Sequence, residues 1–313
     1  IRFWYYGLTV SLSATASSEY KSGKKMTKIQ FSNGGTLRDV LELKFETSPL
    51  ILCFPHSGDI YPDDFDYNPS LTFEQIDFPA DKYVDELFSE AQTLGVSTLK
   101  ANFPRTYVDV NRHQHDIDVN MIEEGEDWYG RLLPGSVDVG ATLFWSKSGE
   151  LPIYDRKLTK KESKGRLANF FIPYHQSMTV MVEAVRKKHG SVFIVDCHSM
   201  TRFDSKLRGG KERPEIDIGT RRGESCSTDL EEKMAELFAA RGYDVGINKR
   251  YVGGEITLRY GWPEIEQHIL QVELRRDLYM EETSRTKSER FPKMKEDCSA
   301  ILRDFKAYVE NRN

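Results

Sequence analysis

The chain has 313 residues, of which 39% are hydrophobic and 12% aromatic, enough apolar material for one large α/β domain or two ordinary ones. Its formal net charge is -5, and no apolar run approaches the roughly 20 residues that cross a bilayer. These numbers favour a soluble, mildly acidic protein and argue against a nucleic-acid-binding or membrane-spanning one.

The first 25 residues are predicted to lie outside the fold. A basic residue, a short apolar stretch and the ending Ser-Ala-Thr-Ala faintly resemble a secretory leader. The apolar part is short and rich in hydroxyl residues, however, and Met26 opens a stretch that is typical of a folded domain. We therefore expect residues 1–25 to be an N-terminal extension and residues 26–313 to form the domain.

The first clear strand is Leu50–Phe54, an apolar run typical of a strand that is buried on both faces. It stops at Pro55, and His56 and Asp59 follow. Ligands bind at the carboxyl edge of open α/β sheets. Two interpretations are open: a ligand-binding turn, or a hydrogen-bonded turn histidine with a capping aspartate.

Helices and strands are predicted to alternate along the rest of the chain. Helical spacing, with proline, serine or glycine at the ends, predicts helices at 81–94, 173–188, 227–241 and 292–310. Short apolar runs predict strands at 97–102, 192–195, 216–220, 243–247 and 268–274.

Residues 113–165 have little periodicity and many charges, so we expect an irregular charged excursion there, including a solvated lysine-rich stretch at 157–164. The alternation without an internal repeat predicts a single α/β domain with a mixed, largely parallel central sheet flanked by helices. The alternative is two domains that part near residues 113–165.

The cysteines at positions 53, 197, 226 and 298 lie far apart and show no Cys-x-x-Cys spacing. Two of them lie in or beside apolar strand-like runs. This pattern predicts reduced core residues in a reducing compartment, and hence a cytoplasmic location.

Three predicted strand ends carry reactive side chains: His56 with Asp59, His198 with Asp196, and Glu273. Two imidazoles and a carboxylate are the ligand set of a catalytic zinc site, which keeps one coordination position open. Zinc bound in this way lowers the pKa of its water and polarises a carbonyl. Glu273 is the candidate to take the water's proton and pass it to a leaving nitrogen.

Arg112, Arg275 and Arg259 are candidates for holding a carboxylate-bearing substrate, because guanidinium groups match carboxylates bidentately. Arg112 also has a structural interpretation, as a partner of Asp109. The glycine pair at 253–254 is either a tight bend or a place where backbone approaches a ligand closely.

Other hydrolase chemistries find less support. The Gly-x-Ser-x-Gly elbow of serine hydrolases is missing from the sequence. Cys197 stands beside His198, but adjacent residues on a strand point to opposite faces, so the pair cannot easily act together.

A series of motifs resembles the N-formylglutamate amidohydrolase family over roughly residues 47–283. In chain order they are Pro55-His-Ser-Gly58, Tyr107-Val-Asp-Val-Asn-Arg112, Pro173-Tyr-His175, Asp196-Cys-His-Ser-Met200, Asp217-Ile-Gly219, Gly253-Gly-x-Ile-Thr257 and Gln271-Val-Glu-Leu-Arg275. The resemblance implies a fold similar to that of the zinc carboxypeptidases and aspartoacylases.

The resemblance also implies roles for individual residues. The resemblance implies that His56, Asp59 and His198 hold one zinc ion or another divalent metal ion. It also implies that Glu273 is the base. Asn111 and Arg112 hold a substrate carboxylate, and Arg259 or Arg275 meets a second one. Asp59 stands where the carboxypeptidase pattern has glutamate, so Asp196 is the other candidate for the third ligand.

The implied reaction is hydrolysis of an N-acyl amino acid, with N-formyl-L-glutamate giving L-glutamate and formate, a step of histidine degradation. A small molecule is then the expected partner, with no nucleic acid or membrane. The alternatives are another N-acyl amino acid deacylase, a carboxypeptidase-like metallopeptidase, or a binding protein of the same fold without activity.

Overall fold

The computed structural model describes residues 18–21, 24–27, 40–123, 140–204 and 209–312. Its centre is a seven-stranded sheet in the order β10-β9-β11-β8-β4-β5-β3. The strands are β3 (Leu41–Lys44), β4 (Leu50–Phe54), β5 (Ser97–Ala101), β8 (Val192–Met200), β9 (Ile216–Gly219), β10 (Val245–Ile247) and β11 (Gln267–Arg275). Only the β3–β5 and β9–β11 pairings of this sheet are antiparallel. The predicted mixed, largely parallel sheet is therefore confirmed.

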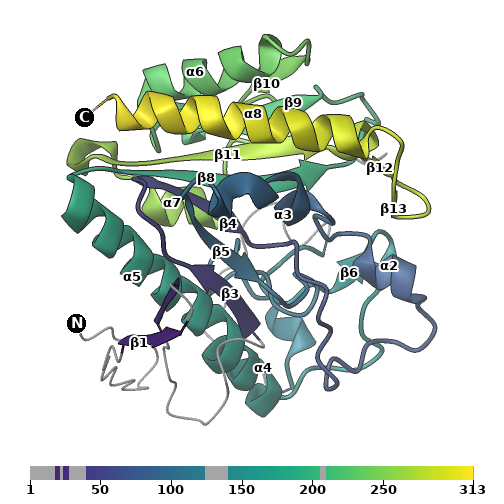
Figure 1. Cartoon of the computed structure of the whole chain (residues 1–313). Coiled ribbons are helices and arrows are strands. Elements are labelled where there is room, and N and C mark those ends of the chain that lie inside the picture. The colour runs from purple at the N-terminus through teal and green to yellow at the C-terminus, as the bar shows by residue number, and fades with distance from the viewer. Residues whose placement is uncertain (1–17, 22–23, 28–39, 124–139, 205–208, 313) are drawn as a thin grey trace.

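Helices cover both faces of the sheet. They are α2 (Phe73–Asp77), α3 (Val84–Leu87), α4 (Lys160–Arg166), α5 (Ile172–His189), α6 (Thr228–Ala239), α7 (Glu255–Tyr260) and α8 (Phe291–Glu310). Figure 1 shows α6 and α8 above the sheet and α5 below it. The long helices α5, α6 and α8 confirm three of the four predicted helices.

Shorter elements join these layers. The single-turn helices are η1 (Ser89–Gln92), η2 (Val119–Met121), η4 (Leu167–Phe171, a π-helix), η6 (Arg221–Gly223), η7 (Pro263–Ile265) and η8 (Arg276–Leu278). Three two-stranded hairpins are β1–β2 (Ser18–Lys21 and Lys24–Thr27), β6–β7 (Lys147–Ser148 and Leu151–Pro152) and β12–β13 (Met280–Glu281 and Thr286–Lys287).

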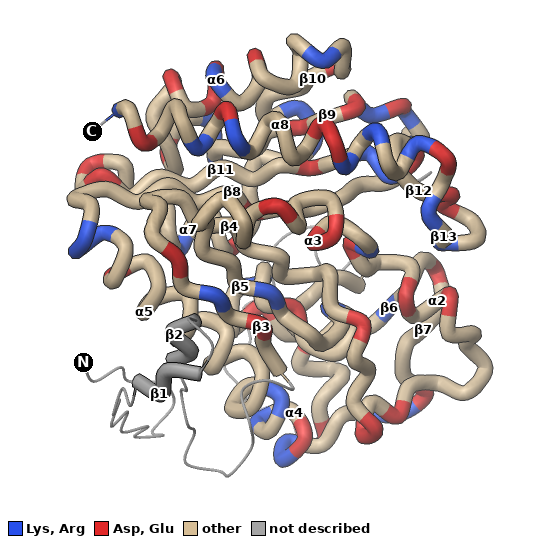
Figure 2. The backbone as a smooth tube through the Cα atoms, viewed as in Figure 1, with Lys and Arg blue, Asp and Glu red and all other residues tan. Residues whose placement is uncertain are grey.

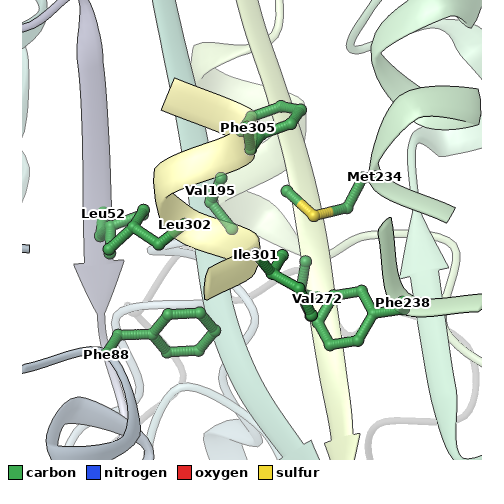
Figure 3. Close-up of a pocket in the computed structure, with 9 residues that line it drawn as sticks. All are labelled: Leu52, Phe88, Val195, Met234, Phe238, Val272, Ile301, Leu302 and Phe305. Atoms are coloured by element: carbon green, nitrogen blue, oxygen red, sulfur yellow. The ribbon is translucent and has the colours of Figure 1, made fainter. Parts of the chain in front are cut away.

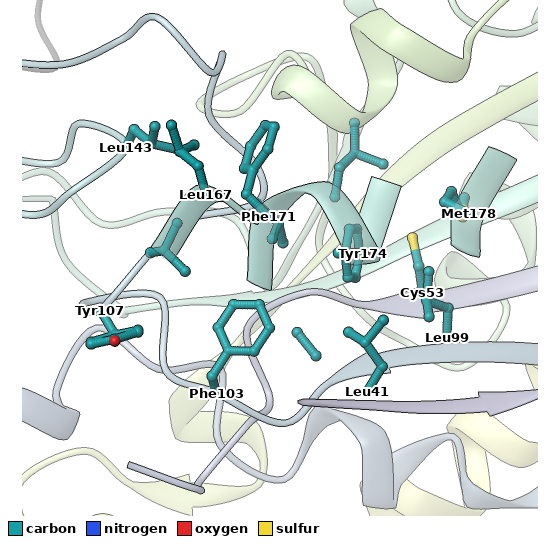
Figure 4. Close-up of a cluster of buried hydrophobic side chains, with 14 of the residues drawn as sticks. Leu41, Cys53, Leu99, Phe103, Tyr107, Leu143, Leu167, Phe171, Tyr174 and Met178 are labelled. Carbon is teal, nitrogen blue, oxygen red and sulfur yellow. The ribbon is translucent and has the colours of Figure 1, made fainter. Parts of the chain in front are cut away.

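Each face of the sheet has its own apolar core, because successive side chains of a strand point to opposite faces. On the α5 side, Cys53 and Leu99 pack with Phe171 and Met178 (Figure 4). On the other side, the strands, α6 and α8 enclose an apolar pocket (Figure 3). The pocket is lined by Leu52, Phe88, Val195, Met234, Phe238, Val272, Ile301, Leu302 and Phe305.

The predicted helix 81–94 is shorter in the structure. Its first three residues form a turn, and α3 begins only at Val84. Tyr83 has a left-handed backbone with φ 68°, which a continuous α-helix does not allow. Asp81 therefore lies in a turn ahead of the helix.

The described part of the segment 113–165 is mostly irregular, yet several of its side chains are buried. Leu143, Phe144 and Leu158 are buried in the core on the α5 side. The lysine-rich stretch includes the start of α4, whose cap is Thr159, and Arg166 in its last turn is almost fully buried. This segment thus packs into the same core as the sheet.

In the described part of the N-terminal region, the strands of the β1–β2 hairpin pair with each other and not with the central sheet. Most of the predicted extension, including residues 1–17, lies outside the described residues.

Within the described residues, all four cysteines are buried and free, as predicted. None of the described helices is long and apolar enough to cross a membrane. Figure 2 shows basic and acidic residues interspersed along α6 and α8.

Candidate active site

The carboxyl ends of β8 and β11 place an imidazole beside a carboxylate. The two strands are parallel neighbours, and His198 is the register partner of Glu273. Cys197 and Val272 belong to the core beneath α6 and α8. Since side chains alternate along a strand, His198 and Glu273 point to the opposite face. The predicted separation of Cys197 from His198 is confirmed.

His56, Asp81 and His198 bring three donor atoms together. His56 Nδ1 lies 3.1 Å from His198 Nδ1 and 3.3 Å from Asp81 Oδ2. His198 Nδ1 lies 3.0 Å from the same oxygen. All three residues are buried. They come from the end of β4, the turn before α3, and β8, so only the folded chain assembles them.

This donor set fits a small divalent cation. A tetrahedral zinc ion with bonds of about 2.0–2.1 Å separates neighbouring donor atoms by about 3.3 Å, close to the distances found here. Two imidazole nitrogens and one carboxylate are also the chemistry of a catalytic zinc site. Three buried lone-pair donors facing one another are costly unless a cation or proton lies between them.

Each histidine has a second carboxylate close to its other ring nitrogen. His56 Nε2 donates to Asp109 Oδ1 at 2.8 Å, and His198 Nε2 lies 2.9 Å from Asp196 Oδ2. Such a carboxylate fixes the ring and its tautomer, so that Nδ1 is left for a metal. Asp196, the alternative third ligand, thus lies behind the ring rather than among the donor atoms. Although burial opposes it, Asp196 raises the pKa of His198 well above its usual value.

Asp81 occupies the place that the sequence pattern assigned to Asp59. Asp59 is exposed and lies outside the group, so its expected grouping with the two histidines is corrected. The reason lies in the backbone around His56. Asp81 N donates to His56 O at 2.9 Å, and Ser57 Oγ donates to Asp81 O at 3.0 Å. These bonds draw the turn before α3 against the histidine.

Asp109 is a residue that sequence reasoning treated only as a partner of Arg112. Its Oδ2 accepts from Arg105 Nη2 at 2.9 Å and from Trp145 Nε1 at 3.0 Å. Although burial opposes ionisation, Arg105 and His56 hold the pKa of Asp109 well below its usual range. The sequence does indicate a buried role for Asp109, because this acid lies between Val108 and Val110 and a buried acid needs a partner.

Glu273 is fixed by a short chain of hydrogen bonds. Gln271 Nε2 donates to Glu273 Oε1 at 2.7 Å, and Gln271 Oε1 accepts from Gly254 N at 3.0 Å. Burial raises the pKa of Glu273 to about 8. A nearby cation favours the carboxylate form, so a metal at the histidines would keep Glu273 ionised at neutral pH and able to accept a proton.

Gly254, the second glycine of the pair, is close to Asn111 rather than to open space. A Cβ on Gly254 would lie 2.4 Å from Asn111 Oδ1. That oxygen accepts from Ile256 N at 2.8 Å, while Asn111 Nδ2 lies 3.3 Å from His198 Nε2. The structure therefore brings the predicted residue Asn111 to the site and explains why position 254 has no side chain.

The predicted arginines differ in their surroundings. Arg112 adjoins Asn111 and donates to Ala141 O and Asn111 O. Arg259 is paired with Glu255 at 2.8 Å. Arg275 donates to Asp277 at 2.7 Å and is near Glu212 and Glu215. These last two arginines thus already have carboxylate partners within the chain.

Arg105 is a cation at the site that sequence reasoning did not single out. Its Nε and Nη2 are held by Asp109, and its guanidinium lies 4.9 Å from the centre of the Trp145 ring. Burial lowers its pKa, but Asp109, Asp81 and then Glu273 raise it above the usual value. Arg105 and His56 thus bind the same carboxylate, that of Asp109, which links Arg105 to the donor group.

Comparisons with known proteins agree on one family. The sequence model of the N-formylglutamate amidohydrolase family matches residues 48–280. An N-formylglutamate deformylase of Pseudomonas putida is 31% identical over 237 residues, which cover 75% of this chain and 83% of that protein. One from Pseudomonas aeruginosa is 29% identical over 245 residues, covering 78% of this chain and 86% of that protein.

Solved structures give the same picture. The crystal structure of an N-formylglutamate amidohydrolase from Ralstonia eutropha has a TM-score of 0.82 and 32% identity, and covers 88% of this chain and 100% of that chain. A gene product of Agrobacterium tumefaciens, with a TM-score of 0.60 and 17% identity, covers 88% of this chain and 98% of that chain, and shares the fold. The chain belongs to the N-formylglutamate amidohydrolase family.

Proposed function

We propose that this protein is a metal-dependent enzyme that hydrolyses N-formyl-L-glutamate to L-glutamate and formate. The observation that carries the proposal is the buried group His56–Asp81–His198, with Glu273 in register beside His198. Similarity to deformylases over 75% of the chain supports the choice of substrate.

The metal ion, with zinc as the first candidate, would be held by the three facing donor atoms. When bound there, zinc lowers the pKa of a water molecule and polarises a carbonyl oxygen. Glu273 accepts the proton of the attacking water and returns it to the leaving nitrogen. Asp109 and Asp196 keep the two imidazoles turned toward the metal. Gln271 holds the carboxylate of Glu273 in place.

The substrate carries two carboxylates, which call for cationic partners. Arg112, beside Asn111, is the proposed partner of one of them. For the other, Arg259 and Arg275 remain candidates, but their pairing with acidic side chains would have to be exchanged. Arg105 is a further candidate, because it shares the carboxylate of Asp109 with His56, and its guanidinium lies 4.9 Å from the centre of the Trp145 ring.

A substrate panel tests this function. Formate release is measured from N-formyl-L-glutamate, N-formyl-L-glutamine and N-formyl-L-alanine, and acetate release from N-acetyl-L-glutamate. We expect N-formyl-L-glutamate to have the highest kcat/KM by at least about tenfold, because each substitute loses a paired charge or adds bulk. Equal turnover of the acetyl and formyl substrates would instead favour a broader N-acyl amino acid deacylase.

The cytoplasmic location and the place in histidine degradation stay predictions.

A further inference from the structure

Two buried arginines from the C-terminal part of the chain hold the turn that carries Asp81. Arg276 lies in η8, and Arg285 lies between the two strands of the β12–β13 hairpin. Their side chains are 5% and 3% exposed. Both guanidinium groups lie near the ring of Phe78 and donate to backbone carbonyls of residues 77–80.

The two arginines differ in the side chains that they contact. Arg276 Nη2 lies 3.3 Å from Asp81 Oδ1, and Arg276 Nε donates to Ser199 Oγ at 3.0 Å. Ser199 Oγ in turn donates to Asp81 Oδ1 at 2.9 Å. Arg285 donates instead to Asp77 Oδ2 at 3.2 Å. Arg276 and Ser199 therefore hold the carboxylate itself, whereas Arg285 holds only the neighbouring turn.

The two oxygens of Asp81 are thereby divided between two tasks. Oδ1 receives the hydroxyl and the guanidinium, while Oδ2 faces the Nδ1 atoms of His56 and His198. A carboxylate held in this way cannot rotate without breaking charge-assisted hydrogen bonds in a buried place. Its free oxygen is therefore already in position for a metal, and binding needs no further ordering of the side chain.

We propose that Arg276 and Ser199 are positioning residues that fix Asp81 as a one-oxygen ligand of the metal centre. The inference rests on the proposed metal centre and adds to it.

The test measures zinc affinity directly, so it does not depend on activity. Metal-free wild type, Ser199→Ala, Arg276→Lys and Arg285→Lys are titrated with zinc against a chromophoric chelator, and the thermal unfolding of each metal-free protein is recorded. We expect Ser199→Ala and Arg276→Lys to weaken zinc binding about 10- to 100-fold, as is usual when an outer partner of a ligand is lost. Arg285→Lys is the matched control, and we expect a lower Tm with zinc affinity within about threefold of wild type.

The possible outcomes distinguish a failure of the positioning role from a failure of the metal centre. If Arg285→Lys weakens zinc binding as much as Arg276→Lys, or if Ser199→Ala leaves affinity unchanged, the positioning role is wrong although the metal centre stands. If wild type itself binds no zinc or other divalent cation, the metal centre fails together with this inference. Should Arg276→Lys not fold, Ser199→Ala decides, because it removes one hydroxyl and leaves both arginines in place.

Discussion

The three donor atoms include one from Asp81, which the sequence pattern did not single out, and none from Asp59, which it assigned as a ligand. Asp81 faces both histidines, whereas Asp59 is exposed and lies outside the group. We predict that Asp81→Asn lowers zinc affinity by more than about 100-fold, which exceeds the loss expected when a residue that only hydrogen-bonds to a ligand is replaced. We predict that Asp59→Asn leaves zinc affinity unchanged. Zinc titration of the two metal-free variants measures this. Loss of zinc in Asp59→Asn alone would reverse the assignment.

Glu273 has a separate role from the ligands. The Glu273→Gln variant keeps the shape and the hydrogen bond from Gln271 through its amide oxygen, but it cannot accept a proton. We expect kcat to fall about 10²- to 10⁴-fold while the bound metal is retained. The comparison of metal content with formate release measures both. Turnover near that of wild type would remove Glu273 as the base.

At the scale of elements, the loop into α7 is shaped by contact with Asn111. The Gly254→Ala variant adds a Cβ 2.4 Å from Asn111 Oδ1. We expect it to cost about 1–3 kcal/mol of unfolding free energy and to lower kcat, because Asn111 must move away from His198. Urea denaturation and steady-state kinetics measure the two effects.

Gly165 in α4 provides a matched control for this change. A Cβ there meets no atom within 4 Å. The Gly165→Ala variant is therefore expected to stabilise the protein by about 0.5–1 kcal/mol and to leave kcat unchanged. If both variants behave alike, the close contact at position 254 is not what shapes the loop.

The strand ends were the part of the site that could be predicted from sequence. His56, His198 and Glu273 each end or follow an apolar run, and buried polar groups at such places need partners. Asp81 stands 25 residues after His56, in a stretch with helical spacing. Its turn depends on the left-handed backbone of Tyr83 and on hydrogen bonds from distant residues, which leave no local pattern.

The layers of the fold were predictable for a similar reason. Long periodic helices and continuous apolar strands carry their burial pattern in the sequence itself. The short helix α7 and edge strand β3 do not, because tertiary packing decides them. The arginines that hold residues 77–81 lie about 200 positions away in the chain, a separation that no sequence pattern reports.

At the scale of the whole molecule, buried His175 links folding to pH. Its Nε2 lies 3.0 Å from Val110 O and its Nδ1 lies 3.1 Å from Tyr260 Oη. Burial, together with the charge of Arg259, lowers its pKa well below the usual value. Below pH 6.5 the unfolded chain therefore binds a proton that the folded chain does not, so stability falls as the pH falls.

We expect the wild type to lose about 1.4 kcal/mol more unfolding free energy than His175→Gln between pH 7.5 and pH 5.5. Urea denaturation of both proteins at the two pH values measures the difference, and groups common to both cancel. An equal loss in the two proteins would show that His175 is not a neutral buried residue. The test compares how much the free energy of unfolding changes with pH in each protein, so the absolute stability of the variant does not affect it.

The central claim is that the group at His56, Asp81 and His198 binds a metal that hydrolysis requires. Metal analysis of purified wild type and His198→Ala, combined with assays of formate release from N-formyl-L-glutamate, tests it most directly. We predict about one divalent ion per wild-type chain, little in the variant, and activity that a chelator abolishes and added zinc restores. Equal metal content in both proteins, or full activity of chelator-treated wild type, would contradict the account.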